Sequence, residues 1–294
     1  MSPRRVPYAR AVRLANWALL DRLTQRWVRT TGRPVDLHDR TWLAGPHGGR
    51  GSWLHREAGR LGARVRDGEA DAGLLPSMTA LDGPAFDADD LHPHVRDFYE
   101  HTTRWRVDLW SQWSPWAWPF GWLISALFAR RLQQLALPLR PMDVAHGMTS
   151  EVTPVAAPDG TPLGASWQRR LRATGTTVFS GWYQPIVLPG DAQPRVRVVF
   201  PLPNGRLVVL LRPQVTADGG LLLTSPGGRD GAHLVVERGP RAWTRRIPVH
   251  ERFHVHVDTE DVLRTDHTLN LWSIPVLKLH YRLDERDRAV TAAP

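Results

Sequence analysis

Two His-x-His pairs are the residues whose type and spacing are best suited to chemistry. His254 and His256 lie in the alternating run Arg-Phe-His-Val-His-Val, which predicts a strand. Residues two apart in a strand share a face, so both imidazoles would reach one metal ion or act together as acid and base. In the other pair, His92 and His94, a helix that begins at the intervening Pro93 would direct the two rings apart.

A metal site at His254 and His256 would need a third ligand, which Asp258 or His280 could offer. No third ligand follows at the short spacing that zinc sites usually show. We therefore expect no metal and no cofactor. For catalysis by proton transfer, the candidate residues are His254, His256, Asp258 and His280.

The predicted last strand puts three polar side chains on one face, in alternation with apolar ones: Lys278, His280 and Arg282. If this strand lies beside that of His254 and His256, the five side chains form a basic patch that would bind an anionic head group or a carboxylate. The alternative, which we favour, is the solvated outer face of an antiparallel sheet whose other face is buried.

Several kinds of catalytic site are excluded or unsupported. The chain has no cysteine, which excludes disulfides, thiolate nucleophiles and cysteine-bound zinc. It has no nucleophile elbow, because Phe179-Ser180-Gly181 lacks the first glycine, and no Walker A, dinucleotide-binding or His-Glu-x-x-His motif. The string Asp87-Ala88-Asp89-Asp90 matches the D-x-D-D motif of protonating terpene cyclases, but its position before Leu91 favours a helix start.

The net charge is strongly positive but dispersed. There are 38 Lys and Arg against 29 Asp and Glu, a formal charge of +9, and Lys278 is the single lysine. No segment concentrates the excess, so we expect no phosphate-tracking stripe and no nucleic-acid partner. The first residues contain arginines without an uncharged apolar run or a cleavage site, so no secretory signal is predicted and the cytoplasm is the expected compartment.

A tryptophan-rich segment spans residues 105–137. Six of the 14 tryptophans lie between residues 105 and 122, and residues 109–129 have no charge. Pro115 and Pro119 interrupt any continuous membrane-spanning helix. We favour a buried helix that packs on the sheet over a true span. The alternative that stays open is peripheral contact with the inner membrane face through an interfacial set of side chains: Trp116, Trp118 and Trp122.

The two halves of the chain have different periodicities. Apolar residues recur at helical spacing in the first 60 residues, over Trp53–Val65 and over residues 90–110, which predicts helices. From about residue 166 the period becomes two, with regular turn residues, which predicts about ten antiparallel strands. Asn204-Gly205 is a strong hairpin signal between two of them.

These periodicities predict an α+β fold. We divide the chain into a mainly helical region, residues 1–150, and a sheet or barrel region, residues 151–294. The helical N-terminal portion would pack on a large curved antiparallel sheet or a lipocalin-like barrel, since a sheet must bury its apolar face. Neither half has an evident complete core, so we expect one cooperative unit.

Short strings in the chain resemble a lipocalin-like bacterial domain of unknown function that is often fused to dehydrogenase modules. They are Leu-His-Pro-His-Val-Arg-Asp-Phe-Tyr at 91–99, Ser-Trp-Gln-Arg-Arg at 166–170, the strand at 252–257 and Ile-Pro-Val-Leu-Lys-Leu-His-Tyr-Arg at 274–282. The whole chain also resembles uncharacterised actinobacterial proteins that share the strings FYEHT, WPFGWL and VVFPLPNG. The resemblance implies a barrel-like module for a ligand or lipid and supplies no catalytic residue.

Three functions are compatible with these observations. The first is binding of a hydrophobic small molecule or lipid in a barrel-like pocket at the membrane surface, with a wall of strand residues: Val196, Val198, Phe200, Leu207, Val209, Leu211, Val255, Leu277 and Leu279. The remaining ligand-binding candidates are Trp116, Trp118, Trp122, Lys278 and Arg282.

The second function is an isomerase or cyclase that acts on a similar ligand, and the third is a pocketless module that binds a membrane or a protein. A cavity with apolar walls would favour the first, a cavity with a buried acid or base the second, and a closed core the third. The oligomeric state stays open.

Overall fold

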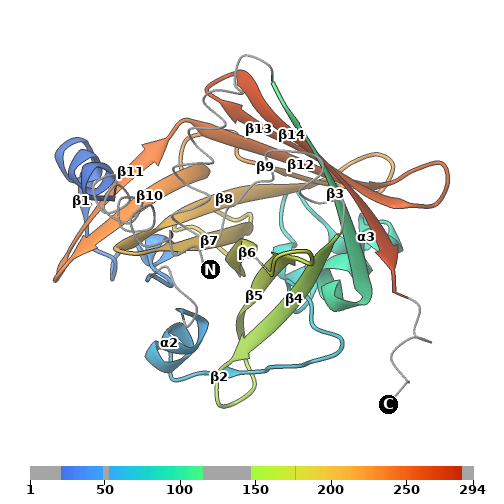
Figure 1. Ribbon diagram of the computed structural model, residues 1–294, viewed down its shortest axis with the longest axis horizontal. Helices are drawn as coiled ribbons and strands as arrows, with labels where there is room; N and C mark the ends of the chain where they lie inside the picture. The colour runs from blue at the N-terminus through green and yellow to red at the C-terminus, as the bar shows by residue number, and fades with distance from the viewer. Residues whose placement is uncertain (1–20, 49–52, 115–146, 176, 287–294) are drawn as a thin grey trace, which may run out of the picture.

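The computed structural model describes residues 21–48, 53–114, 147–175 and 177–286. The protein is mostly β, with one antiparallel sheet of 14 strands and short helices that precede most of them (Figure 1). The helices are residues 21–31, α2 (Trp53–Arg60) and α3 (Pro93–Glu100), with 3₁₀ turns η1 (Thr41–Leu43), η2 (Met78–Leu81), η3 (Ala88–Asp90) and η4 (Thr102–Arg104). The strands are β1 (Arg33–Val35), β2 (Arg64–Val65), β3 (Trp105–Trp113), β4 (Met148–Ala156), β5 (Pro162–Leu171), β6 (Thr177–Ile186), β7 (Arg195–Leu202), β8 (Gly205–Val215), β9 (Leu221–Thr224), β10 (Gly231–Arg238), β11 (Arg241–Ile247), β12 (Val249–Val257), β13 (Leu263–Leu271) and β14 (Ile274–Glu285).

The main path of the sheet runs β2-β4-β5-β6-β7-β8-β9-β12-β13-β14-β3. β8 pairs along one side with β7, and on its other side with β10 over its first half and β9 over its second. The sheet therefore branches at β8, where β10, β11 and β1 form a wing that Figure 1 shows at the left. Among the described strands no ladder joins β2 to β3, so the large curved sheet is confirmed and the closed barrel is wrong.

The first half of the chain is less helical than the spacing of its apolar residues predicts. α2 ends at Arg60, before Gly62 turns the chain with a φ of +63° toward β2, so the helix expected to Val65 is too long. The helix expected over residues 90–110 is also wrong in its second half, because α3 stops at Glu100 and β3 begins at Trp105. Burial in β3 alternates from Trp105 to Leu109, as expected of a strand with one buried face. This alternation and the pairing with β14 favour a strand over a helix for residues 105–113.

The predicted strands of the second half are confirmed, since each has a counterpart among β5 to β14. The Asn204-Gly205 hairpin is also confirmed: Leu202 pairs with Gly205 across a two-residue turn. Position 205 requires glycine because a Cβ there would lie 2.0 Å from the carbonyl oxygen of Val235 on β10. Gly205 thus permits both the hairpin between β7 and β8 and the close approach of β10.

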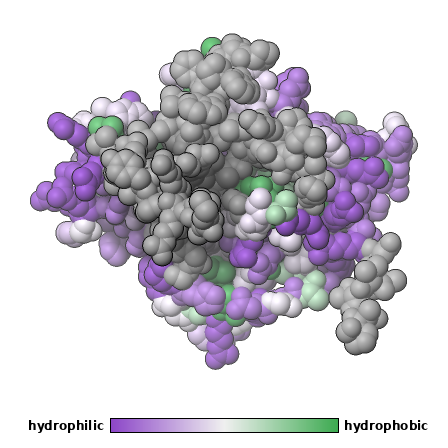
Figure 2. Space-filling model, in the orientation of Figure 1, coloured by the Kyte–Doolittle hydropathy of each residue, from purple (hydrophilic) through white to green (hydrophobic). Residues whose placement is uncertain are grey.

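Apolar side chains cover both faces of the central strands. On the inner face, residues of β5, β7, β8, β9 and β12 form the largest buried cluster with α3 and η2. On the opposite face, Trp53 of α2 and Leu43 of η1 pack with Val199 and Val208. β7 is therefore buried on both sides, as its nearly uninterrupted burial shows. In the view of Figure 2, hydrophilic residues dominate the left and right margins and hydrophobic ones reach the surface near the centre.

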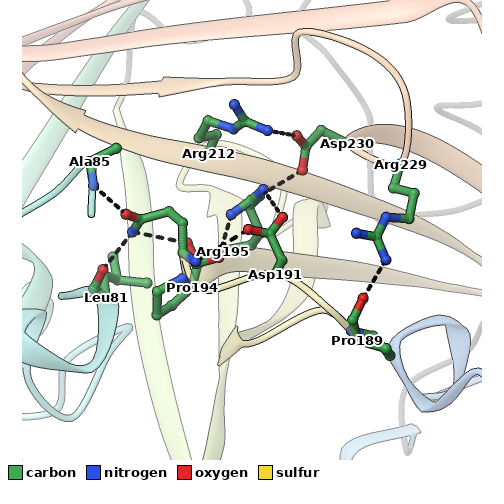
Figure 3. A network of polar contacts seen from close by, with 10 residues as sticks. Leu81, Ala85, Pro189, Asp191, Pro194, Arg195, Arg212, Arg229 and Asp230 are labelled. Atoms are coloured by element: carbon green, nitrogen blue, oxygen red, sulfur yellow. Dashed lines mark hydrogen bonds and ion pairs between the residues drawn. The ribbon is translucent and has the colours of Figure 1, made fainter. Parts of the chain in front are cut away.

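A buried charge network ties the loops to the sheet (Figure 3). Arg195 of β7, which is 1% exposed, donates to Asp230 at 2.7 Å and to Asp191 at 2.6 Å. Arg212 of β8 reaches the other carboxylate oxygen of Asp230 at 2.9 Å. Each buried charge here has an opposite charge beside it, which compensates for the loss of water.

Two further buried arginines also have acceptors. Arg197 donates to backbone carbonyls around η1, including Ala44 at 2.8 Å, and to Gln184 Oε1 at 2.7 Å. Arg206 pairs with Glu237 and donates to the Leu43 carbonyl at 3.0 Å. Burial lowers the pKa of both guanidiniums to about 10, so both stay charged at neutral pH.

Candidate functional site

The inner face of the sheet lines a cavity of about 1030 Å³. Among the described residues, its walls come from strands β5 to β14, from α3 and from Trp113 at the end of β3, with Leu74 and with Thr24 and Trp27 of the helical residues 21–31. All the strand residues expected as an apolar pocket wall line it: Val196, Val198, Phe200, Leu207, Val209, Leu211, Val255, Leu277 and Leu279. The alternation of each strand therefore predicted correctly which side chains would face inward.

An aromatic cluster gives one part of the cavity a defined shape. Trp167 of β5 meets the rings of Phe179 at 5.5 Å, Tyr183 at 5.7 Å and Phe98 at 6.3 Å between centroids, and each contact is edge-to-face. Phe179 also meets Phe200 edge-on at 5.4 Å. Such contacts fix ring positions as well as burying area, so the wall is preformed.

Arg169 is a buried cation in this aromatic wall. It is two residues from Trp167 on β5, so both side chains face the cavity, and it is 7% exposed. Its guanidinium carbon lies 3.7 Å from the centre of the Trp167 ring and 5.2 Å from that of Tyr281. Among the described residues no carboxylate is within ion-pairing distance of Arg169, and its Nε has no hydrogen-bond partner.

The titration properties of this region follow from burial. Burial lowers the pKa of Arg169, because the charged form loses its water. Burial also raises the pKa of Tyr183 and of Tyr281, against the opposing effect of the Arg169 charge. The phenols therefore keep their protons at neutral pH and can donate hydrogen bonds into the cavity.

Glu251 and His267 line the same cavity from the adjacent strands β12 and β13. Nε2 of His267 lies 3.3 Å from Oε2 of Glu251 without the alignment of a hydrogen bond. Both ring nitrogens are buried with no hydrogen-bond partner among the described residues. The imidazole stacks on Phe253 with 3.7 Å between centroids. A carboxylate beside an imidazole can exchange protons with a bound molecule, so this pair is suited to acid–base chemistry.

The predicted histidine patch lies on the opposite face of the sheet, and its two strands are not neighbours. β13 lies between β12 and β14, and its Asp266 is in register with His254 on one side and His280 on the other. Nδ1 of His280 lies 2.8 Å from Oδ1 of Asp266. The face expected to be basic is therefore of mixed charge, because an intervening strand supplies a carboxylate.

His254 and His256 come together as their spacing predicted. Their rings stack with 4.5 Å between centroids. Nε2 of His254 and Nδ1 of His256 are buried, and no described residue forms a hydrogen bond with either atom. Burial and the neighbouring His256 lower the pKa of His254, which keeps its imidazole neutral. With Asp266, the two residues offer three ligand atoms that all lie within 4.8 Å of one another.

Asp258 does not join this group. Its Oδ1 accepts from the backbone of Glu260 at 2.9 Å and of Val262 at 3.0 Å, and Arg264 donates to its other oxygen. The hydrogen bond from Arg264 and those from the backbone lower the pKa of Asp258 to about 2. Asp258 therefore holds the turn between β12 and β13.

The other predicted side chains have separate surroundings. Arg282 pairs with Asp284 at 3.0 Å. Lys278 lies with His280 and Trp110 around a second pocket of about 350 Å³. In the pair at the start of α3, Nδ1 of His92 accepts from the backbone N–H of His94 at 3.2 Å and so caps the helix. Three predicted ligand-binding residues lie outside the described part of the chain: Trp116, Trp118 and Trp122.

Sequence reasoning missed Arg169, Glu251, His267 and Asp266. The signal for Arg169 was present, since a cation alternates there with Trp167 on the inward face of a predicted strand. Glu251 was missed because the strand expected over residues 252–257 begins earlier, at Val249. Asp266 and His267 lie on β13, whose start at Leu263 the alternation of the sequence did not mark. Strand ends are poorly marked in sequence, and here they include the polar groups.

The chain is a distant homologue of YndJ, an uncharacterised membrane protein of Bacillus subtilis, with 27% identity over 218 residues. The match covers 72% of this chain and 38% of YndJ, so the chain spans well under half of that protein's length. No family model and no solved structure matches the chain. Within the described residues, every helix is too short or too polar to span a membrane. The expected lipocalin-like family stays a prediction.

Proposed function

We propose that this protein binds a hydrophobic small molecule or a lipid chain in the cavity on the inner face of its sheet. The main support is the cavity itself, which has a volume of about 1030 Å³ and walls made mostly of aliphatic and aromatic side chains. Ligand sites usually measure roughly 300–1,000 Å³ and are lined mostly by such residues. An apolar space of this size gains little from water, so an apolar occupant would stabilise it.

The size of the cavity predicts how affinity depends on the length of the ligand. Each methylene buried against the apolar wall contributes about 0.8 kcal/mol, or about a fourfold gain in affinity. For straight-chain alcohols, affinity should rise with length until the cavity is filled and then level off. Non-specific adsorption to the surface would show no such plateau.

The test is displacement of the neutral fluorescent probe N-phenyl-1-naphthylamine by a series of straight-chain alcohols. Val209→Phe would occupy part of the cavity, since Val209 is 2% exposed and lines it, and should weaken binding of the longest alcohols by about tenfold. Val187→Phe is the matched control, since Val187 is 56% exposed and does not line the cavity. Equal behaviour of the two variants, or no dependence on length, would contradict the proposal.

A second candidate function is catalysis on the same ligand by an isomerase or cyclase type of reaction. The specific observation in its favour is the Glu251–His267 pair at 3.3 Å in the cavity wall. A lipid extract of the producing cells, incubated with the protein and followed by mass spectrometry, would separate the two functions. Conversion that Glu251→Gln abolishes, with probe binding intact, indicates an enzyme. An unchanged extract that nonetheless displaces the probe indicates a carrier.

We also propose that binding takes place at the membrane surface. The support is the tryptophan-rich composition of residues 105–137 and the homology to a protein named as a membrane protein. A peripheral site would let an apolar ligand pass from the bilayer to the cavity without crossing water. The cavity gives no support to the pocketless alternative.

A further inference from the structure

We propose that Arg169 receives an anionic head group, so that the cavity selects carboxylate or phosphate amphiphiles over neutral molecules of the same length. The inference rests on the proposed function, because it concerns the occupant of the same cavity. It goes further by naming the chemical class of that occupant and the residue that distinguishes it.

The first argument is the contrast between Arg169 and the other buried arginines. Arg195 has two carboxylate partners, Arg206 has Glu237, and Arg197 has backbone carbonyls and Gln184. Within the described residues Arg169 has none of these, although it is 7% exposed. An uncompensated buried guanidinium is strongly unfavourable, so an opposite charge supplied by a ligand would remove a large penalty.

The second argument is the way in which Arg169 is held. One face of the guanidinium lies on the Trp167 ring at 3.7 Å, which is a cation–π contact. This contact satisfies the face of the group and leaves its N–H donors, which lie in the guanidinium plane, for an acceptor. The planar fork of arginine matches two oxygens of a carboxylate or phosphate. Water would make a weaker and less oriented partner.

The third argument is the set of phenols around the guanidinium. Tyr99, Tyr183 and Tyr281 all interact electrostatically with Arg169, and Tyr281 comes within hydrogen-bonding reach. Tyr183 and Tyr281 line the cavity and, being protonated, can donate to the same anion. Val196 and Val198 of β7 add aliphatic surface to the wall. Further charged or titratable side chains also line the cavity, among them Arg245, Arg246, Glu251 and His267. The cavity thus combines a cationic, donor-rich region with an apolar region, which is the pattern of an anionic amphiphile.

The experiment compares ligands that share one chain and differ in the head group. Palmitate, hexadecyl phosphate, hexadecanol and methyl palmitate each compete with N-phenyl-1-naphthylamine for the wild-type chain at neutral pH. We expect at least one of the two anions to bind about tenfold or more tightly than both neutral ligands, since a charge-assisted contact forms in a dry site. Preference for palmitate or for the phosphate then distinguishes the two head groups.

Two substitutions locate the effect. Arg169→Gln should reduce the preference for the anion to about twofold or less while hexadecanol still binds, and Arg169→Lys should retain part of the preference. Arg170→Gln is the matched control, because Arg170 is the next residue of β5, is exposed and does not line the cavity. It should leave the preference unchanged, which excludes a general effect of net charge.

The outcomes separate this inference from the proposed function. If anions and neutral ligands bind the wild-type chain equally, the cavity binds lipids and the role of Arg169 is wrong. Equal loss of preference in Arg169→Gln and Arg170→Gln would also overturn it. If no ligand displaces the probe, the proposed function itself fails. The wild-type comparison needs no variant, so an unfolded variant would not remove the test.

A second inference concerns the outer face and does not depend on the cavity. We infer that His254, His256 and Asp266 bind a divalent transition-metal ion such as Zn²⁺. Their three ligand atoms lie within 4.8 Å of one another, and imidazole with carboxylate is a usual donor set for zinc. This inference departs from our expectation of no metal, because the third ligand comes from β13, which sequence spacing could not place.

Two further observations support a metal ion at this site. Nε2 of His254 and Nδ1 of His256 are buried without a hydrogen-bond partner in the described part of the chain, and an ion would satisfy such atoms. Nδ1 of His280 lies 2.8 Å from Asp266, as an outer partner that orients a ligating carboxylate does. β12 thus supplies two ligands, β13 the third ligand and β14 its support, and His254, Asp266 and His280 are in register across the three strands.

Calorimetric titration of ZnCl₂ into the untagged protein, after treatment with EDTA and dialysis, tests the site. We expect one ion per chain, with affinity reduced about tenfold or more by Asp266→Asn, by His256→Ala and, through loss of support, by His280→Ala. His94→Ala is the control, since it alters the other His-x-His pair. Absence of zinc binding by the wild-type chain, or an equal loss in the control, would overturn the inference.

Discussion

Arg195 and Arg169 are both buried, yet their surroundings are opposite. Arg195 is compensated by Asp191 and Asp230, which tie β7 to two loops. Arg169 lies on Trp167 and faces a cavity. A charge that stabilises a fold needs a partner in the chain, whereas a charge that binds a ligand must be left without one. Among the described residues, the lack of a carboxylate partner therefore distinguishes Arg169, which we propose as the ligand-binding arginine, from the buried Arg195.

The compensated network makes a prediction for stability. Asp230→Asn leaves Arg195 and Arg212 without their shared carboxylate and should lower the free energy of unfolding by about 3–5 kcal/mol, because Arg195 stays buried. Asp284→Asn removes the exposed pair with Arg282 and should cost less than about 1 kcal/mol. Urea unfolding at neutral pH measures both. A small effect of Asp230→Asn would show that the network does not hold the loops.

The buried imidazole of His233 predicts how the stability of the protein depends on pH. It is 7% exposed, meets Trp42 edge-on at 5.2 Å, and burial lowers its pKa below the ordinary 6.5. A base with a lowered pKa takes its proton more readily in the unfolded chain, so this contribution to stability is present above pH 6.5 and is lost as the pH falls toward the pKa of the folded state. His233→Gln should flatten the dependence of unfolding free energy between about pH 7.5 and 5.5. An unchanged slope would contradict the assignment.

At the scale of elements, β12 separates the two candidate sites, because its side chains alternate between the two faces of the sheet. β12 directs Glu251, Phe253 and Val255 into the cavity, and His254 and His256 to the outer face. The separation follows from the period of two and needs no special sequence. A ligand in the cavity and an ion on the outer face would therefore act on the same strand without touching each other.

β3 provides a prediction at this scale. Leu109 is 8% exposed and packs with Leu277 and Leu279, whereas the adjacent Trp110 is 51% exposed. Leu109→Ala should lower the free energy of unfolding by about 2–5 kcal/mol, and Trp110→Ala by less than about 1 kcal/mol. Thermal and urea unfolding test the contrast. Equal effects would contradict the alternation of a strand over residues 105–113.

At the scale of the whole molecule, the proposed binding at the membrane surface can be tested with lipid vesicles. Replacement of Trp116, Trp118 and Trp122 together by Ser should abolish sedimentation of the protein with vesicles of anionic lipid, because interfacial binding depends on such side chains. The melting temperature should change by only a few degrees. Unchanged sedimentation would remove the membrane proposal and leave the cavity proposal intact.

Much of the local structure follows from the sequence alone. Alternation predicted the strands from β5 to β14, the apolar residues of the cavity wall and the shared face of His254 and His256. The hairpin at Asn204-Gly205 followed from turn chemistry. These features depend on side-chain alternation and turn geometry, which involve only residues one to four positions apart in the sequence.

The tertiary structure alone decided the order of the strands. It put β13 between β12 and β14, which brought Asp266 to the histidines. Among the described residues, it left Arg169 without a carboxylate while giving two to Arg195. It also made residues 105–113 an edge strand on β14 instead of a helix. The cost of closing a longer loop rises only slowly with its length, so the sequence between two strands does not specify which of them pair. That choice depends on packing across the whole sheet, and both candidate sites depend on it.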